Sequence, residues 1–306
     1  MSLKIIFMGT PKFSIKSLES IFNSKHKILT VYSQPPKKKL RGHKVISSPI
    51  HKLSEKLGLS VRTPTSLGND REYNFILNNK PNVVVVVAYG KIIPKKILDI
   101  PEILFINVHA SLLPKFRGAS PINRAILNLE KETGITIMKI KEKLDSGPYM
   151  KQVKVQINSD TTAGDLEEKL SEIGAKSLIE SLEVIENGKH KFIEQDEQKA
   201  TYAPKIKKEE TRINWLLDAE KIIGQINAFN PQPGAWFFYA NKRIKVLDAI
   251  SVNKIGKPGE VLDDKLTISC KKNSIKILKL QKEGKSSMVT EDFLLGNKIK
   301  KGEILG

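Results

Sequence analysis

The chain has 306 residues, of which 40% are hydrophobic and 28% charged, and its formal net charge is +19. This length allows two domains, and the composition excludes a disordered or fibrous protein. The single cysteine, Cys270, excludes an internal disulfide, and no Cys or His cluster has zinc-site spacing. No apolar run approaches the ~18 residues of a membrane span, and the first one is too short for a signal peptide. We therefore expect a cytoplasmic protein with no metal and no membrane partner.

The positive charge is unevenly distributed along the chain. Residues 1–110 carry a net charge of +12, residues 111–206 a net charge of 0, and residues 207–306 a net charge of +7. Two basic ends around a neutral middle favour a polyanionic partner such as a nucleic acid. The alternative, that the lysine-rich faces are only solvated surface, stays open on charge alone.

Short apolar runs and helix-like stretches alternate in the first half. We expect strands over residues 4–8, 27–33, 82–88, 104–109 and 134–140. We expect helices over residues 13–22, 49–57, 121–129 and 162–185. This alternation predicts a doubly wound α/β domain. Gly9-Thr10-Pro11 follows the first strand but lacks the G-x-G-x-x-G pattern, which excludes a nicotinamide-binding motif there.

The pattern changes after about residue 205. A charged connector, Lys205–Glu210, leads to a helix-like run over residues 218–229. Short strand-like runs then cover residues 236–239, 244–249, 265–269 and 275–281, separated by turn signals. Closely spaced short strands predict a small antiparallel barrel. We therefore expect two domains, residues 1–204 and residues 205–306.

The strand over residues 104–109 ends in Asn107-Val108-His109. Side chains at i and i+2 of a strand share a face, so Asn107 and His109 project together. Ser111-Leu112-Leu113-Pro114 then breaks the strand, which places both polar groups at a strand's carboxyl end, where open α/β sheets bind ligands. By itself such a pair is more often structural than catalytic.

A carboxylate follows the next predicted strand. Asp145 lies in the turn Leu144-Asp145-Ser146-Gly147, from which it could reach the imidazole, or it could only stabilise its own loop. An amide donor, a titratable ring and a carboxylate that orients the ring are the groups that acyl transfer requires. The combination therefore favours an acyl-transfer site.

At this point the chain resembles the methionyl-tRNA formyltransferases over essentially its whole length. The resemblance rests on Gly9-Thr10-Pro11, on Val85–Gly90, on Asn107–Pro114 with Arg117-Gly118-Ala119, and on Leu144–Gly147. The Asn-x-His…Asp set is shared with other transferases that use 10-formyltetrahydrofolate. Tyr202–Ile206 and Phe229-Asn230-Pro231 resemble the linker and C-terminal domain of the tRNA enzymes.

The resemblance implies a Rossmann-like N-terminal domain, an OB-like C-terminal β-barrel, and formyl transfer from 10-formyltetrahydrofolate to the amino group of methionyl-initiator tRNA in translation initiation. It makes Asn107, His109 and Asp145 the catalytic set, with Asp145 fixing the imidazole tautomer. The implied folate site comprises Tyr89, Gly90, Ile92, Ser111, Leu112, Leu113 and Pro114, and the backbone of the last four is expected to be free for a ligand. The implied tRNA contacts, toward the acceptor stem, are Lys39, Arg41, Lys44 and Lys208. A monomer without a metal is expected.

Two alternatives remain. One is a formyltransferase that acts on a small amine, such as a ribonucleotide or an amino sugar, against which the basic C-terminal domain argues. The other is a non-catalytic RNA-binding protein on a transferase scaffold, against which the intact Asn107, His109 and Asp145 argue. Formylation assays on both kinds of substrate separate all three readings.

Overall fold

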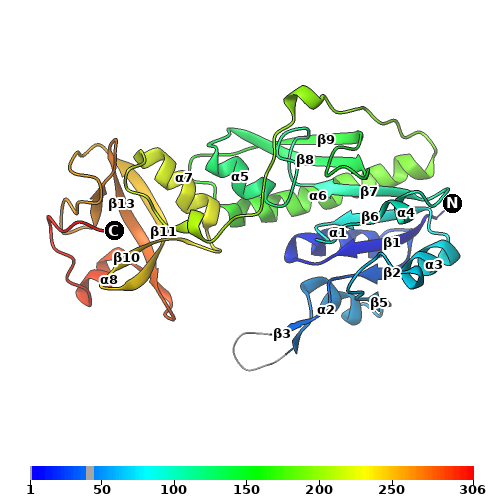
Figure 1. The fold of residues 1–306 in the computed structure, drawn as a ribbon, viewed down its shortest axis with the longest axis horizontal. Coiled ribbons are helices and arrows are strands. Elements are labelled where there is room, and N and C mark those ends of the chain that lie inside the picture. Colours follow the sequence, from blue (N-terminus) through cyan, green and yellow to red (C-terminus); the bar gives the residue numbers. More distant parts are fainter. Residues whose placement is uncertain (1, 39–44) are drawn as a thin grey trace. The chain divides into compact units, whose positions relative to one another are not determined.

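A computed structural model describes residues 2–38 and 45–306 of the chain. Their contacts divide them into two compact units (Figure 1). Unit 1 comprises Met1–Pro121, Thr133–Val155 and Glu167–Ala203; unit 2 comprises Ile122–Glu132, Gln156–Leu166 and Pro204–Gly306. Two segments that precede residue 204 thus group with the C-terminal residues. The single boundary expected between residues 204 and 205 stays a prediction.

Unit 1 is built around a seven-stranded sheet with the order β5-β2-β1-β6-β7-β8-β9. The strands are β1 (Lys4–Gly9), β2 (Lys27–Tyr32), β5 (Val61–Arg62), β6 (Val83–Val87), β7 (Leu104–His109), β8 (Glu132–Lys139) and β9 (Tyr149–Gln156). Parallel pairing joins the strands from β5 to β7, whereas β8 runs antiparallel to β7. The five strands expected in the first half are confirmed, and β5 and β9 are additional to them.

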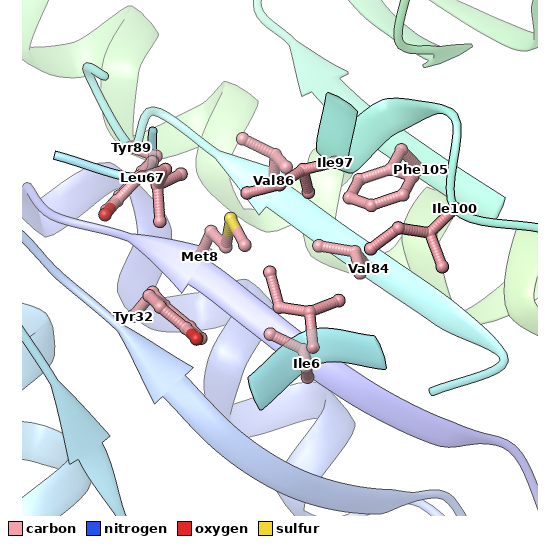
Figure 2. Close-up of a cluster of buried hydrophobic side chains, with 11 residues drawn as sticks. Ile6, Met8, Tyr32, Leu67, Val84, Val86, Tyr89, Ile97, Ile100 and Phe105 are labelled. Atoms are coloured by element: carbon pink, nitrogen blue, oxygen red, sulfur yellow. The ribbon is translucent and has the colours of Figure 1, made fainter. Parts of the chain in front are cut away.

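Buried side chains of the central strands form a core cluster in unit 1 (Figure 2). Ile6 and Met8 of β1 belong to it together with Val84 and Val86 of β6. All five residues of β6 are buried, as expected for a β-branched run without a polar face. This core holds β6 and β7 side by side, so the residues at their carboxyl ends lie at one edge of the sheet.

Side-chain hydrogen bonds cap the starts of two of the predicted helices. The Ser48 side chain accepts a hydrogen bond from the His51 backbone N–H at α2 (Pro49–Lys56), and Thr162 and Asp165 exchange hydrogen bonds at the start of α6 (Ala163–Glu186). The other helical segments of the first 203 residues are η1 (Lys12–Ser14), α1 (Ile15–Phe22), α3 (Asp70–Asn79), α4 (Lys95–Leu98), α5 (Pro121–Leu127) and η2 (Glu197–Lys199). The four expected helices are confirmed, whereas α3 and α4 are additional.

Unit 2 contains an antiparallel sheet with the order β10-β11-β13-β12, in which β14 also pairs with β13. Its elements are η3 (Glu209–Thr211), α7 (Ala219–Phe229), β10 (Ala235–Tyr239), β11 (Lys242–Val252), β12 (Thr267–Ser269), β13 (Ser274–Lys282), β14 (Ser287–Val289) and α8 (Thr290–Leu295). The expected helix and four strands are confirmed. A separate pair, β3 (Lys37–Lys38) and β4 (Val45–Ile46), flanks the undescribed residues 39–44. The α/β sheet and the antiparallel sheet confirm the predicted fold class.

Candidate active site at the carboxyl end of strand β7

Asn107 and His109 lie in the last three residues of β7, which ends at His109 as predicted. Both are two residues apart on one strand and therefore share a face. The Asn107 side chain is half-buried and makes no hydrogen bond with any described residue. His109 is buried, with 6% of its surface exposed. The site therefore offers an unengaged amide beside an enclosed imidazole.

The two ring nitrogens of His109 have different surroundings. Nε2 lies 2.9 Å from the backbone oxygen of Phe116, and a carbonyl oxygen can only accept a hydrogen bond. Nε2 therefore carries a hydrogen and donates it. Nδ1 lies 3.7 Å from Oδ2 of Asp145, which is ion-pair distance but too long for a hydrogen bond. Nδ1 is thus the nitrogen that is free to gain or lose a proton.

Asp145 reaches this position from a turn rather than from a parallel strand end. β8 is antiparallel to β7, and its last residue, Lys139, pairs with Ile106. The turn that follows brings Asp145 back to the imidazole, with Asp145 itself at φ +45°. Gly147 is required in this turn, because a Cβ there would lie 1.8 Å from the Lys139 carbonyl oxygen.

The backbone of residues 116–118 supports both side chains, a role that the sequence analysis did not assign to this segment. Phe116 accepts the His109 hydrogen bond, and the Gly118 N–H donates to Asp145 Oδ2 at 2.8 Å. Gly118 has φ +120°, and a Cβ there would lie 2.9 Å from the Ala203 carbonyl oxygen. The Phe116 carbonyl, rather than Asp145, therefore sets the imidazole tautomer, which corrects the implied role of Asp145.

The carbonyl oxygens of the turn Ser111–Pro114 and the Leu113 N–H already have partners within the protein, contrary to the expectation of a free backbone. The Ser111 carbonyl accepts from the Thr136 hydroxyl at 2.6 Å, and the Leu113 N–H donates to the same hydroxyl oxygen at 3.1 Å. The Leu113 carbonyl accepts from Gln152 at 2.7 Å, and the Leu112 carbonyl accepts from Lys115 N–H. Side chains of β8 and β9 thus hydrogen-bond backbone groups of this turn, and these contacts fix the position of the turn after His109.

The other predicted folate residues follow β6. Val86 pairs with Asn107, so the chain after Val87 leaves the sheet at the level of His109. Gly90 and Ile92 are exposed there, with Ile92 88% exposed. The Tyr89 ring instead lies in the core cluster (Figure 2), where burial raises its pKa to about 12. Tyr89 can therefore face a ligand only through its backbone.

The predicted tRNA contacts divide in two. Lys39, Arg41 and Lys44 lie outside the described residues. Lys208 is exposed at the start of η3, and its carbonyl oxygen accepts a hydrogen bond from the Thr211 hydroxyl. Its ammonium group is therefore available to a partner in solution.

Unit 2 also carries a surface that the sequence analysis missed. Trp236 and Phe238 share a face of β10, and their partners on β11 are Lys245 and Arg243. The Arg243 guanidinium lies 4.4 Å from the Trp236 ring centre, and that of Arg212 lies 5.6 Å from the Phe238 ring centre. Neither guanidinium forms an ion pair within the described part of the chain. We call these five residues the basic aromatic surface. Trp236 is buried, so Phe238 and the two guanidinium groups are the parts that suit contact with phosphates and bases.

Two further findings concern other kinds of site. Across residues 2–38 and 45–306, no group of three or more His, Cys, Asp or Glu side chains is arranged to hold a metal ion. In the same residues, no helix has the length and apolarity to cross a membrane.

Family models and curated relatives match nearly the whole chain. The formyl transferase model matches residues 3–182, and the model of the formyl transferase C-terminal domain matches residues 205–298. A methionyl-tRNA formyltransferase of Pelagibacter ubique is 47% identical over 304 residues, which cover 99% of this chain and 98% of that protein. The enzyme of the same name from Paramagnetospirillum magneticum is 42% identical over 305 residues, covering 99% and 100%.

Solved structures agree on the fold. An N-formyltransferase from Helicobacter canadensis, in complex with folinic acid and dTDP-3-aminofucose, has a TM-score of 0.69 at 22% identity and covers 92% of this chain and 100% of that one. HypX from Aquifex aeolicus, in complex with tetrahydrofolic acid, has a TM-score of 0.64 at 18% identity and covers 100% and 51%. The chain therefore belongs to the formyl transferase family and, within it, to the methionyl-tRNA formyltransferases.

Proposed function

We propose that this chain transfers the formyl group of 10-formyltetrahydrofolate to the α-amino group of methionyl-initiator tRNA for translation initiation, with Asn107, His109 and Asp145 as its catalytic residues. One observation carries the assignment of the site. An amide without a described partner lies on the same strand face as an imidazole whose Nδ1 is 3.7 Å from a carboxylate. The near-full-length relatives named for this activity support the reaction.

The reaction joins two substrates and needs one proton transfer. The neutral methionyl amine attacks the formyl carbon, a C–N bond forms, and the carbonyl electron pair moves onto oxygen. The bond between that carbon and N10 of the folate then breaks, the carbonyl re-forms, and the proton lost by the amine ends on N10. No electrons are gained or lost, so the protein must stabilise an oxyanion and move a proton.

Asn107 is suited to the oxyanion. Its amide can donate a hydrogen bond without breaking one, because no described residue occupies it. A donor fixed on a strand needs little reorganisation when charge develops, and removing one such donor typically costs ~10²–10³ in turnover.

His109 is suited to the proton. Nε2 is held by the Phe116 carbonyl, so Nδ1 accepts the amine proton and returns it to N10. The Asp145 carboxylate stabilises the imidazolium that exists between these two transfers. Gly118 holds that carboxylate through a backbone N–H at 2.8 Å. The proton therefore moves through one defined nitrogen.

The folate is proposed to lie between two segments at the same sheet edge. Gly90 and the exposed Ile92 follow β6, while Ser111, Leu112, Leu113 and Pro114 follow β7. Because the backbone of the second segment is already hydrogen-bonded, we expect it to contribute shape and apolar contact. Tyr89 contributes through its backbone only.

The tRNA is proposed to bind through basic groups, with its acceptor stem toward Lys39, Arg41, Lys44 and Lys208. Residues 1–110 and 207–306 carry net charges of +12 and +7, which favours a polyanion. The basic aromatic surface of unit 2 adds two guanidinium groups that lie on aromatic rings and form no ion pair with the residues that the structure describes. We propose that the enzyme acts as a monomer in the cytoplasm.

A substrate comparison tests this function. The purified chain is given 10-formyltetrahydrofolate with methionyl-initiator tRNA, methionyl-elongator tRNA or a nucleotide-linked amino sugar, and formylated product is measured by mass spectrometry. We expect rapid formylation of the initiator tRNA and at least ~10²-fold lower kcat/KM for the other two, which is ~2.7 kcal/mol of discrimination. Preferential formylation of the amino sugar would overturn the proposal.

A further inference from the structure

Residues 193–203, which we call the strap, lie in unit 1 and contact the backbone segments that support His109 and Asp145. Near its start Ile193 pairs with Tyr149, and near its end Tyr202 pairs with Arg117. Between them, the Phe116 N–H donates to the Thr201 hydroxyl at 2.9 Å. The Arg117 N–H donates to the Thr201 carbonyl at 2.9 Å. The strap therefore holds the backbone whose Phe116 carbonyl receives the His109 hydrogen bond.

The Gln195 side chain connects the strap to the Asp145 turn. Its Nε2 donates to the Asp145 carbonyl at 2.9 Å and to the Gly147 carbonyl at 2.7 Å. Its Oε1 accepts from Arg117 Nε at 3.1 Å and from Arg117 Nη2 at 2.8 Å. Because a guanidinium can only donate and a carbonyl can only accept, this amide has one possible orientation.

Arg117 is fully buried, with 0% of its surface exposed, although it carries a charge. Its guanidinium donates to Gln195 and to both carboxylate oxygens of Glu197, at 2.7 and 3.2 Å. Hydrogen bonds from Arg117 and then Lys143 lower the pKa of Glu197 to about 2, so this partner is ionised at neutral pH. A buried charge is costly unless it is fully paired, which makes this arrangement sensitive to any change.

Arg117 lies between the two residues whose backbone groups contact His109 and Asp145. Its two neighbours are Phe116, which holds His109 Nε2, and Gly118, which holds Asp145 Oδ2. Through Gln195, the same residue is connected to the turn that carries Asp145, whose φ of +45° is uncommon for a non-glycine residue although aspartate adopts it more readily than most. One guanidinium–amide pair thus links the segment that orients the imidazole to the turn that presents the carboxylate.

We propose that Gln195 and Arg117 are positioning residues that set the distance between His109 Nδ1 and the Asp145 carboxylate. This inference rests on the proposed function, because the distance between His109 and Asp145 matters only if these two residues act in the reaction. Neither residue needs to contact a substrate.

The test compares Gln195→Met with Gln198→Met. Gln195→Met keeps side-chain length and removes every hydrogen bond of the amide, whereas Gln198 is exposed in the same strap and its side chain has no described partner. We expect Gln195→Met to lower kcat about 10–100-fold with the KM values for folate and tRNA within threefold of wild type, as a small misplacement of catalytic groups does. Gln198→Met should keep wild-type kcat, and a kcat of Gln195→Met within twofold of this control would overturn the proposal.

A double-mutant cycle distinguishes positioning from a general structural role. If Gln195 acts through Asp145, Gln195→Met should lower kcat by less than threefold in an Asp145→Asn background. A full additional loss in that background would contradict the proposal. Should Gln195→Met fail to fold, Gln195→Glu replaces it, because its carboxylate can still accept from Arg117 but lacks the two N–H donors. The kcat of Gln195→Glu should fall in the same way. A wild-type kcat would refute the positioning role of Gln195.

Hydrogen exchange separates failure of this inference from failure of the proposed function. Amides of residues 143–147 should exchange at least ~10-fold faster in Gln195→Met than in Gln198→Met, even if the wild-type chain did not formylate tRNA. Unchanged exchange in this turn would overturn the positioning role of Gln195 and Arg117 while leaving the formylation result intact.

Discussion

Asp145→Asn removes one charge from the site and leaves its shape. The amide oxygen can still accept the Gly118 N–H, so the turn and the Phe116–Gly118 segment should keep their positions. The lost interaction is that between the carboxylate and the imidazolium formed at Nδ1, 3.7 Å away. At an effective dielectric constant of about 20, two unit charges at this distance attract by ~4.5 kcal/mol. This corresponds to a loss of ~10³ in turnover.

The assay is steady-state formylation of methionyl-initiator tRNA at saturating concentrations of both substrates, with the thermal melting temperature measured in parallel. We expect kcat to fall ~10³-fold while the melting temperature stays within a few degrees of wild type. A variant that retained more than about a tenth of wild-type kcat would lose less than ~1.4 kcal/mol. The carboxylate would then not stabilise the imidazolium, and the role assigned to Asp145 would be wrong.

Three further predictions concern other parts of the molecule. Arg243→Ala should weaken tRNA binding and reduce the magnitude of the log–log salt slope by ~0.7–0.9 without changing the folate Kd, and an unchanged slope in a salt titration would show that the basic aromatic surface does not meet phosphates. Burial raises the pKa of Glu72, but the hydrogen bonds from Arg62 and Tyr32 outweigh it and keep that pKa below 4.5. Glu72→Gln should therefore cost ~3 kcal/mol of unfolding free energy at pH 7, a difference that shrinks as the pH falls below 4.5; a pH-independent difference in urea titrations would contradict this. Burial raises the pKa of the Cys270 thiol to about 11, so a thiol reagent at pH 8 should react with it only after unfolding, and rapid reaction of the folded protein would place this thiol at the surface.

Local sequence pattern was enough to predict the strand that carries the site. β7 ends at His109 because an apolar run meets Ser-Leu-Leu-Pro, and the two-residue period of a strand then places Asn107 beside His109. The glycine and proline around Asp145 likewise predicted a turn, and the structure brings its carboxylate to the imidazole. Such predictions succeed because they depend on neighbours within a few residues.

Contacts made by backbone groups could not be predicted in this way. The Phe116 carbonyl and the Gly118 N–H orient the catalytic pair, but no side chain signals their role. The sequence predicted a free backbone at Ser111–Pro114, but Thr136 and Gln152 occupy the Ser111 and Leu113 carbonyls and the Leu113 N–H. These contacts cross strands whose register only the fold defines. Tyr89 follows a buried strand, and its ring turned inward to the core rather than toward a ligand.

The division into units was equally hidden, since it depends on contacts between distant segments. Ile122–Glu132 and Gln156–Leu166 join the C-terminal residues in unit 2. Within that unit, Asn227 donates a hydrogen bond to the Ser159 carbonyl at 2.9 Å, and Arg124 pairs with Glu210. Deleting the C-terminal residues would therefore leave these partners exposed, so point variants are the better probes of tRNA binding.

The most direct test of the proposed chemistry is single-turnover formylation of methionyl-initiator tRNA by the wild-type chain and by Asn107→Leu. Enzyme in excess over the tRNA, saturated with 10-formyltetrahydrofolate, isolates the transfer step from substrate binding and product release. Because Asn107 is the proposed oxyanion donor, we expect the rate to fall ~10²–10³-fold, with an unchanged Kd for the folate. A single-turnover rate within threefold of wild type would contradict the proposed site.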